Sequence, residues 1–138
     1  MTTRPTKPLP LAAFPEFTKP FWDAARRREL VVQHCNTHNG FFFYPRELCP
    51  NCLSSDWTWT KVSGRGRVYT FTTVHQAENP AFSMDAPYVH AIIQLDEGAR
   101  LVSNVVGCPP QDVRVNMPVV AVFEDVSPEF TLVKFKPA

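Results

Sequence analysis

The residues best able to do chemistry in this chain are three cysteines and a histidine that lie within 18 positions. They form two short motifs, Cys35-Asn36-Thr37-His38 and Cys49-Pro50-Asn51-Cys52. Two residues separate the members of each pair, and ten separate the pairs, which suits two tight turns that close on one tetrahedral ion. Zinc accepts three cysteines and one histidine as well as four cysteines. The motifs therefore predict a structural Zn²⁺ site with the ligands Cys35, His38, Cys49 and Cys52.

Other interpretations of this cluster are open at this point. The cysteines could be small buried residues of a site that has lost its metal. An iron redox centre is disfavoured because it uses four thiolates and His38 replaces one of them. His34 is a rival ligand, but it lies next to Cys35 and breaks the two-residue spacing. Asn39 stands where such a turn often has glycine, and asparagine tolerates the left-handed conformation.

The elements that must position this cluster are a helix, short strands and a small barrel. A helix is predicted from Thr18, as its cap, to about Leu30, with Pro20 in the first turn. Short strands at 30–33 and 41–45 lead into the two metal-binding turns, which is the layout of a zinc ribbon. Five segments rich in Val, Ile, Phe, Thr and Tyr follow: 66–76, 87–96, 100–106, 118–126 and 130–136. Five strands in so small a chain favour a five-stranded OB-fold barrel.

Details of the pattern refine this mainly β architecture. In the second barrel segment the apolar residues alternate with others and define a core face: Val89, Ala91, Ile93 and Leu95. The stretch 109–114 has room for a turn or a short helix. We expect three units, namely an arm and helix at 1–30, a zinc ribbon at 31–60 and an OB-fold domain at 61–138.

Charge and composition narrow the class of partner. The 138 residues include 14 basic and 13 acidic ones, for a net charge of +1. A nucleic-acid-binding protein usually has a basic excess or stripe, and the short run Arg26–Arg28 fits a solvated helix face better.

Residues 1–15 carry four prolines and predict an extended arm. No stretch has the length of a secretory signal or a transmembrane helix, so we expect a cytoplasmic protein.

The order of several stretches resembles the DUF35 family. They are LVVQHCNTHNGFFFYPRELCPNC at 30–52, VSGRGRVYTFTTVH at 62–75, NPAFSMDAPYVHAIIQLDEG at 79–98 and VVGCPPQDVRVNMPVVAVFE at 105–124. The resemblance implies an N-terminal helical segment, a rubredoxin-like zinc ribbon and a C-terminal OB-fold. It also implies a role in acyl-CoA metabolism, beside a thiolase-like or lipid-transfer-protein-like aldolase subunit that carries the chemistry. The chain departs from the family at His38 and at Asn116, where a glycine turn is common.

Candidates for catalysis in the chain itself are few. Cys108 has no local base to activate its thiol, so a small buried residue at a strand end is favoured. His75 and His90 have no carboxylate nearby in sequence to orient their rings, which favours hydrogen-bonded barrel histidines over general bases. The chain has no G-x-S-x-G motif and no phosphate-binding loop. We expect no catalytic residues, and whether the chain forms part of an enzyme is left open.

Two further groups are candidates for binding. Lys61, Arg65 and Arg67 could contact CoA phosphates, since guanidinium groups suit phosphate oxygens, or could form a flexible entry to the first barrel strand. Aromatic residues and arginines are favoured at protein interfaces. The candidates here are Phe41, Phe43, Arg46 and Trp57. The alternative is that these aromatic residues join the ribbon to the barrel.

The resemblance to the DUF35 family, together with the lack of a catalytic motif, implies a non-catalytic, zinc-binding OB-fold subunit. It would support a thiolase-like partner in a hetero-oligomer and help to bind a CoA thioester. The alternatives are a module that binds single-stranded nucleic acid and a stand-alone acyl-CoA thioesterase that uses His75 or His90.

Overall fold

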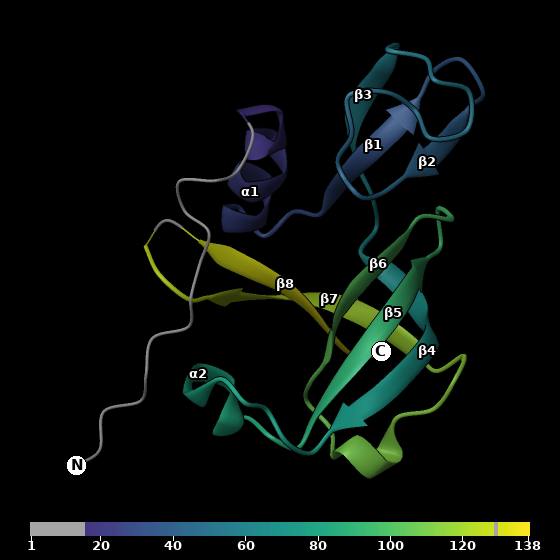
Figure 1. The fold of residues 1–138 in the computed structure, drawn as a ribbon. Coiled ribbons are helices and arrows are strands. Elements are labelled where there is room, and N and C mark those ends of the chain that lie inside the picture. The colour runs from purple at the N-terminus through teal and green to yellow at the C-terminus, as the bar shows by residue number, and fades with distance from the viewer. Residues whose placement is uncertain (1–15, 129) are drawn as a thin grey trace.

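The structure is a computed structural model that describes residues 16–128 and 130–138. A small zinc ribbon and one helix stand side by side on a closed β-barrel (Figure 1). The arm predicted for residues 1–15 lies outside the described residues. In the described part of the chain, no helix is long and apolar enough to cross a membrane.

The N-terminal helix is shorter than predicted. A 3₁₀ turn, η1 (Glu16–Thr18), leads into α1 (Lys19–Arg26). Pro20 occupies the first turn as expected, but the side chain of Thr18 does not cap the helix. Arg28 has a φ of 66°, which ends the helix well before Leu30 because a left-handed residue cannot continue a right-handed one. The buried face consists of Phe21, Ala24 and Ala25.

The ribbon is a three-stranded antiparallel sheet with the order β2-β1-β3. Its strands are β1 (Val31–Cys35), β2 (Gly40–Phe42) and β3 (Trp57–Lys61). The ribbon predicted from the two metal-binding motifs is confirmed. One motif closes the turn from β1 to β2, and the other lies in the connection from β2 to β3.

The five predicted barrel strands are confirmed, with ends that shift by at most two residues. They are β4 (Arg65–Val74), β5 (Tyr88–Leu95), β6 (Arg100–Val105), β7 (Pro118–Asp125) and β8 (Thr131–Pro137). They close in the order β4-β5-β6-β8-β7, which is the OB-fold expected. A short helix, η2 (Pro110–Asp112), fills the predicted turn. A second one, α2 (Pro80–Ser83), was not predicted.

One continuous core joins the three units. The alternating residues of β5 point inward as predicted, and Val89, Ala91, Ile93 and Leu95 are at most 2% exposed. They pack with Val68, Val119 and Phe135 inside the barrel. Phe21 and Ala24 of α1 and Val31 and Val32 of β1 belong to the same cluster. The helix and the base of the ribbon are therefore parts of the barrel's hydrophobic core.

Gly66 lets two strands approach β4 from both sides. It pairs with Leu95 of β5 and with Val119 of β7, where β4 takes part in closing the barrel. A Cβ atom at this position would lie 2.5 Å from the carbonyl oxygen of Gln94. Only glycine fits such a close backbone approach without a shift of β5.

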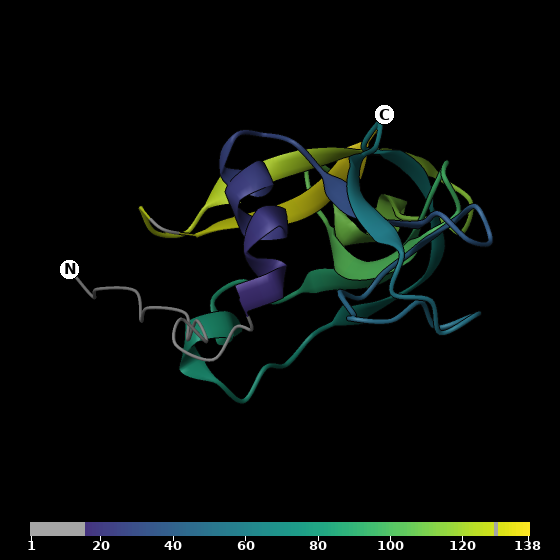
Figure 2. The same cartoon turned by 90° about the horizontal axis from the view of Figure 1, so that it is seen from above.

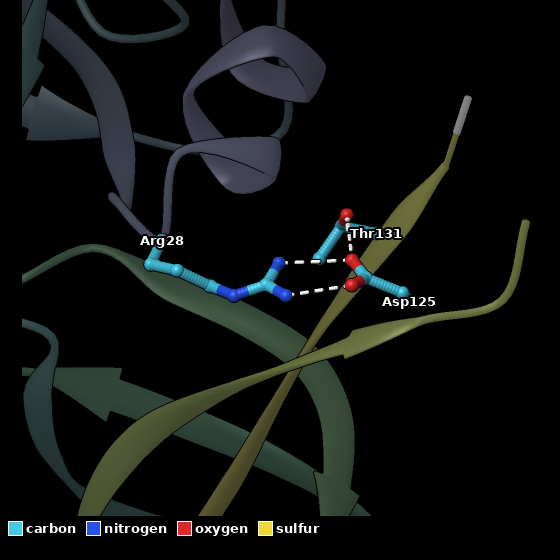
Figure 3. A network of polar contacts seen from close by, with 3 residues as sticks. All are labelled: Arg28, Asp125 and Thr131. Atoms are coloured by element: carbon cyan, nitrogen blue, oxygen red, sulfur yellow. Dashed lines mark hydrogen bonds and ion pairs between the residues drawn. The ribbon is translucent and has the colours of Figure 1, made fainter. Parts of the chain in front are cut away.

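Polar contacts also fix the helix and the ribbon to the barrel. Arg28, just after α1, donates to both carboxylate oxygens of Asp125 at the end of β7, and Thr131 donates to the same carboxylate (Figure 3). The backbone N–H of Val102 on β6 donates to the hydroxyl oxygen of Tyr44 at 3.2 Å. Seen from above, α1 lies across β7 and β8 (Figure 2). The helix and the ribbon are thus held to the barrel by polar contacts as well as by the shared core.

Candidate metal centre

The two motifs place their four ligand atoms together at the tip of the ribbon. Cys35 is the last residue of β1, and His38 lies in the tight turn that follows it. Cys49 begins a second tight turn, in which its carbonyl accepts from the backbone N–H of Leu53 at 2.8 Å. Each of the four residues directs one nitrogen or sulfur atom inward, and these atoms all lie within 4.8 Å of one another.

The spacing of these atoms matches a tetrahedral zinc site. Cys35 Sγ lies 3.5 Å from Cys52 Sγ. Nδ1 of His38 lies 3.3 Å from Cys49 Sγ and 3.8 Å from Cys52 Sγ. Zn–S bonds of about 2.3 Å at tetrahedral angles would separate two sulfur atoms by about 3.8 Å. The cluster is therefore suited to a structural zinc ion, as the sequence predicted.

The first turn also stabilises the thiolate form of Cys35, which a metal requires. Burial alone would raise the pKa of Cys35, but hydrogen bonds from the backbone and the side chain of His38 and from the backbone of Thr37 lower it to about 6. The backbone N–H of Asn51 donates to Cys49 Sγ at 3.4 Å. Backbone donors aimed at sulfur are a feature of metal-binding turns, where they offset the negative charge.

The rival ligand His34 is engaged elsewhere. Its Nδ1 lies 3.2 Å from Oδ1 of Asn36, and its Nε2 lies 3.0 Å from Oδ1 of Asn39. Asn39 adopts a φ of 57°, so asparagine takes the left-handed position as expected. Asn116 does the same in its turn, with a φ of 68°.

The tip of the ribbon has little core of its own. Its buried residues are Cys35, Phe42 and Cys49, with Trp57 packed against them. Two of these three are metal ligands. A structural ion in such a small unit supplies much of its folding free energy.

The predicted interface residues fall into two groups. Phe41, Phe43 and Trp57 are half-buried. Phe41 and Phe43 pack against the core that joins the ribbon to the helix and barrel, whereas Trp57 packs within the tip of the ribbon. Arg46 is exposed, and its backbone is held in place by the buried side chain of Gln33. That amide donates to the carbonyl of Arg46 at 2.6 Å and accepts from its N–H at 2.8 Å.

Three large apolar residues of the ribbon are exposed, and sequence reasoning did not single out Leu48 and Leu53 among them. Tyr44, Leu48 and Leu53 are 46%, 47% and 71% exposed. Leu53 has a φ of 60°, which is unusual for a bulky residue. It follows Cys52 as Asn39 follows His38, and this correspondence was a signal available in the sequence.

The basic candidates do not all lie together. Lys61 ends β3, and its Nζ lies 3.9 Å from the carboxylate oxygen Oε1 of Glu29. Arg65 and Arg67 are exposed on β4, and Arg67 is opposite Gln94, which is opposite Arg100 on β6. Arg100 stacks on the ring of Tyr69 with its guanidinium carbon 3.9 Å from the centroid. Arg100 was missed because only strand register brings it beside Arg67, whereas Tyr69 lies two residues from Arg67 on the same strand.

No hydrogen bond joins the catalytic candidates to one another in the described part of the chain. Burial and the charge of Asp112 raise the pKa of Cys108, which disfavours its thiolate. His75 lies just after β4 and His90 on β5, and both are exposed rather than hydrogen-bonded within the barrel. Among the described residues, neither ring has a carboxylate partner. These three residues do not form a nucleophile–base pair.

Comparisons with known proteins agree with this architecture. Residues 22–58 match the rubredoxin-like zinc ribbon domain of ChsH2, and residues 59–124 match its C-terminal OB-fold domain. A DUF35 domain-containing scaffold protein of Methanocaldococcus jannaschii is 42% identical over 98 residues, which cover 70% of this chain and 69% of that protein. A probable enoyl-CoA hydratase alpha subunit of Thermomonospora curvata is 42% identical over 119 residues, or 86% of this chain. The chain spans only 37% of the length of that relative.

A solved structure shares the whole arrangement. The chain is 38% identical to a chain of the Ltp2-ChsH2(DUF35) aldolase, with a TM-score of 0.80, and the match covers 91% of this chain and 97% of that one. The zinc ribbon, the five-stranded OB-fold barrel and these similarities together show that the chain belongs to the DUF35 family.

Proposed function

We propose that this chain is a non-catalytic scaffold subunit of an acyl-CoA-processing complex, in which a thiolase-fold partner carries the chemistry. The observation that carries this proposal is the likeness, along nearly the whole chain, to a chain of the Ltp2-ChsH2(DUF35) aldolase. The disfavoured thiolate of Cys108 is consistent with a scaffold.

The surface proposed to dock the partner consists of exposed residues of the segment 44–53, which runs from the junction with the barrel to the second metal-binding turn. We call it the knuckle surface and define it by Tyr44, Arg46, Leu48 and Leu53. Three of its side chains are large, apolar and exposed, and the fourth is an arginine on a fixed backbone. Aromatic residues and arginines are favoured anchors at interfaces. A structural metal beneath this surface would hold it in one conformation.

Leu53 gives a physical reason to favour this face. A left-handed conformation costs a non-glycine residue about 1 kcal/mol. Leu53 adopts this conformation, and its side chain is exposed to solvent. Strained residues that persist in a structure often serve binding. A partner that covers Leu53 would give this strain a function.

The CoA thioester is proposed to contact the outer face of β4, β5 and β6. We call Arg65, Arg67, Arg100 and Tyr69 the arginine face. Among the described residues, none of the three arginines forms an ion pair, and Tyr69 is 43% exposed. Guanidinium groups bind phosphate oxygens well, and an aromatic ring can stack on adenine. Lys61, which faces Glu29, has a smaller part in this proposal than the sequence predicted.

The experiment is co-expression with the thiolase-like enzyme encoded nearest to this chain, followed by capture through a tag on this chain. We expect the two proteins to be recovered together, and we expect turnover of the CoA ester only from preparations that contain the partner. Turnover by this chain alone, lost on His75→Ala or His90→Ala, would instead establish a stand-alone thioesterase.

The arginine face also favours one alternative, a module for single-stranded nucleic acid. OB-folds bind single strands with aromatic platforms and basic grooves. The net charge of +1 argues against strong binding of this kind. A salt-dependent shift with single-stranded DNA or RNA, absent from a variant with Arg67→Gln and Arg100→Gln, would decide for this alternative.

A further inference from the structure

The imidazole of His38 has a defined orientation within the metal cluster. Its Nδ1 atom faces the sulfur atoms of Cys49 and Cys52, at 3.3 and 3.8 Å. Its Nε2 atom faces away from the cluster and lies 3.3 Å from the side-chain amide nitrogen of Asn51. We infer that His38 binds the metal through Nδ1 and that Asn51 is the positioning residue that fixes this choice.

The chemistry of a neutral imidazole determines what Asn51 must do. When Nδ1 offers its lone pair to a metal, the ring proton resides on Nε2, and Nε2 becomes a hydrogen-bond donor. The group that faces it must then accept. A half-turn of the Asn51 amide exchanges its nitrogen for its oxygen without changing its shape, so Oδ1 would accept from Nε2–H in the metal-bound protein.

Asn51 is well placed for this role because it contacts two ligands at once. Its side chain faces His38, and its backbone N–H donates to the sulfur of Cys49 at 3.4 Å. Partners of this kind, which fix the tautomer and orientation of a metal-bound histidine, commonly change metal affinity 10- to 100-fold when they are removed. Asn51 thus links the second metal-binding turn to the ligand of the first.

Gly40 supports the same orientation because it leaves room for the imidazole ring. A Cβ atom at Gly40 would meet Nε2 and Cδ2 of His38 well inside van der Waals contact. The absence of a side chain at position 40 therefore leaves the space that the imidazole fills when Nδ1 points at the cluster. A cysteine at position 38 would have no ring to place there. We therefore expect the roles of Asn51 and Gly40 to depend on the histidine.

The test uses the full chain loaded with ¹¹³Cd²⁺ and labelled with ¹⁵N-histidine. We expect the one-bond cadmium–nitrogen coupling on Nδ1 of His38 and a protected proton on Nε2. Asn51→Ala should lower metal affinity about tenfold, as measured by chelator competition, and should speed exchange of the Nε2 proton. Asn51→Asp, which keeps an acceptor, should preserve both.

A double-mutant cycle separates positioning from a general structural role. In a His38→Cys background, Asn51→Ala and Gly40→Ala should have little effect on metal affinity, because no imidazole remains to be oriented. Equal losses in both backgrounds would overturn the inference, and so would a cadmium coupling on Nε2. If Gly40→Ala fails to fold in either background, the cadmium coupling and the Asn51 cycle still decide the question.

Discussion

Arg28 and Asp125 lie 97 residues apart in sequence and form a bidentate ion pair, with N–O distances of 2.8 and 2.6 Å. Arg28 follows helix α1, and Asp125 ends strand β7. The side-chain hydroxyl of Thr131 donates to the same carboxylate at 2.6 Å (Figure 3). This contact ties the segment that follows helix α1 to the antiparallel pair β7 and β8 of the barrel.

The ion pair makes stability depend on pH in a definite direction. Hydrogen bonds from Arg28 and Thr131 hold the pKa of Asp125 well below its ordinary value of 3.8. Its contribution to stability is therefore complete above the unfolded pKa and is lost as the pH falls below about 4 towards the folded pKa. Asp125→Asn should lower the melting temperature at pH 7, and the difference from the parent chain should shrink progressively as the pH falls from about 4 to 2. Asp96→Asn, at an exposed turn residue, is the control, and a parallel loss in that variant would contradict the assignment.

Removal of the metal should unfold the tip of the ribbon. A structural zinc ion contributes on the order of 10 kcal/mol in small ribbons. Chelation, or His38→Ala, should therefore expose Trp57 and shift its fluorescence to the red. Cys108→Ser is the matched control, because Cys108 lies outside the cluster and should leave a full zinc equivalent in place. Retention of that equivalent by His38→Ala would show that His38 is not a ligand.

Substitution of Leu53 by glycine should have opposite effects on the stability of the chain and on partner binding. Leu53→Gly removes the cost of the left-handed backbone and should stabilise the chain by roughly 0.5–1 kcal/mol in a denaturant titration. The same variant should weaken binding of the thiolase-like partner, because it deletes an exposed apolar anchor. Met84→Gln is a control at another exposed apolar residue, 62% exposed and outside the ribbon. Stabilisation without any loss of partner binding would remove Leu53 from the interface.

Substitutions in the arginine face should weaken binding of the CoA thioester and should leave assembly with the partner unchanged. The variant with Arg67→Gln and Arg100→Gln should raise the KM of the complex for its CoA ester about tenfold, since it removes charge-assisted phosphate contacts. The amount of partner recovered with the chain should stay the same. Arg114→Gln, an exposed arginine before β7, is the control. An unchanged KM in the double variant would place CoA elsewhere.

The barrel and the metal ligands could be predicted because their signals are local. Alternation along β5 shows its core face directly, and the spacing of Cys35, His38, Cys49 and Cys52 identifies the cluster. The helix end was predicted wrongly because Arg28 gives no sequence sign of its left-handed backbone. Helix α2 was missed because it has only four residues and its main signal is the cap, where Asn79 Oδ1 accepts from the N–H of Ala81.

The rest of the candidate site required the structure because it depends on register and orientation. Arg100 lies near Arg67 only through the pairing of three strands, and Arg28 meets Asp125 across almost the whole chain. Nothing in a sequence tells which nitrogen of His38 faces the sulfur atoms. The partnership of His38 with Asn51 follows from that orientation.

The central claim is that this chain works as a scaffold bound to a thiolase-fold enzyme. The most direct measurement is the molar mass of the co-expressed proteins by size-exclusion chromatography with light scattering. The account predicts one peak that contains both chains in a fixed ratio, and a return to separate species when the knuckle surface carries Leu48→Gln and Leu53→Gln. A chain that elutes alone, with its zinc bound and its fold intact, would contradict it.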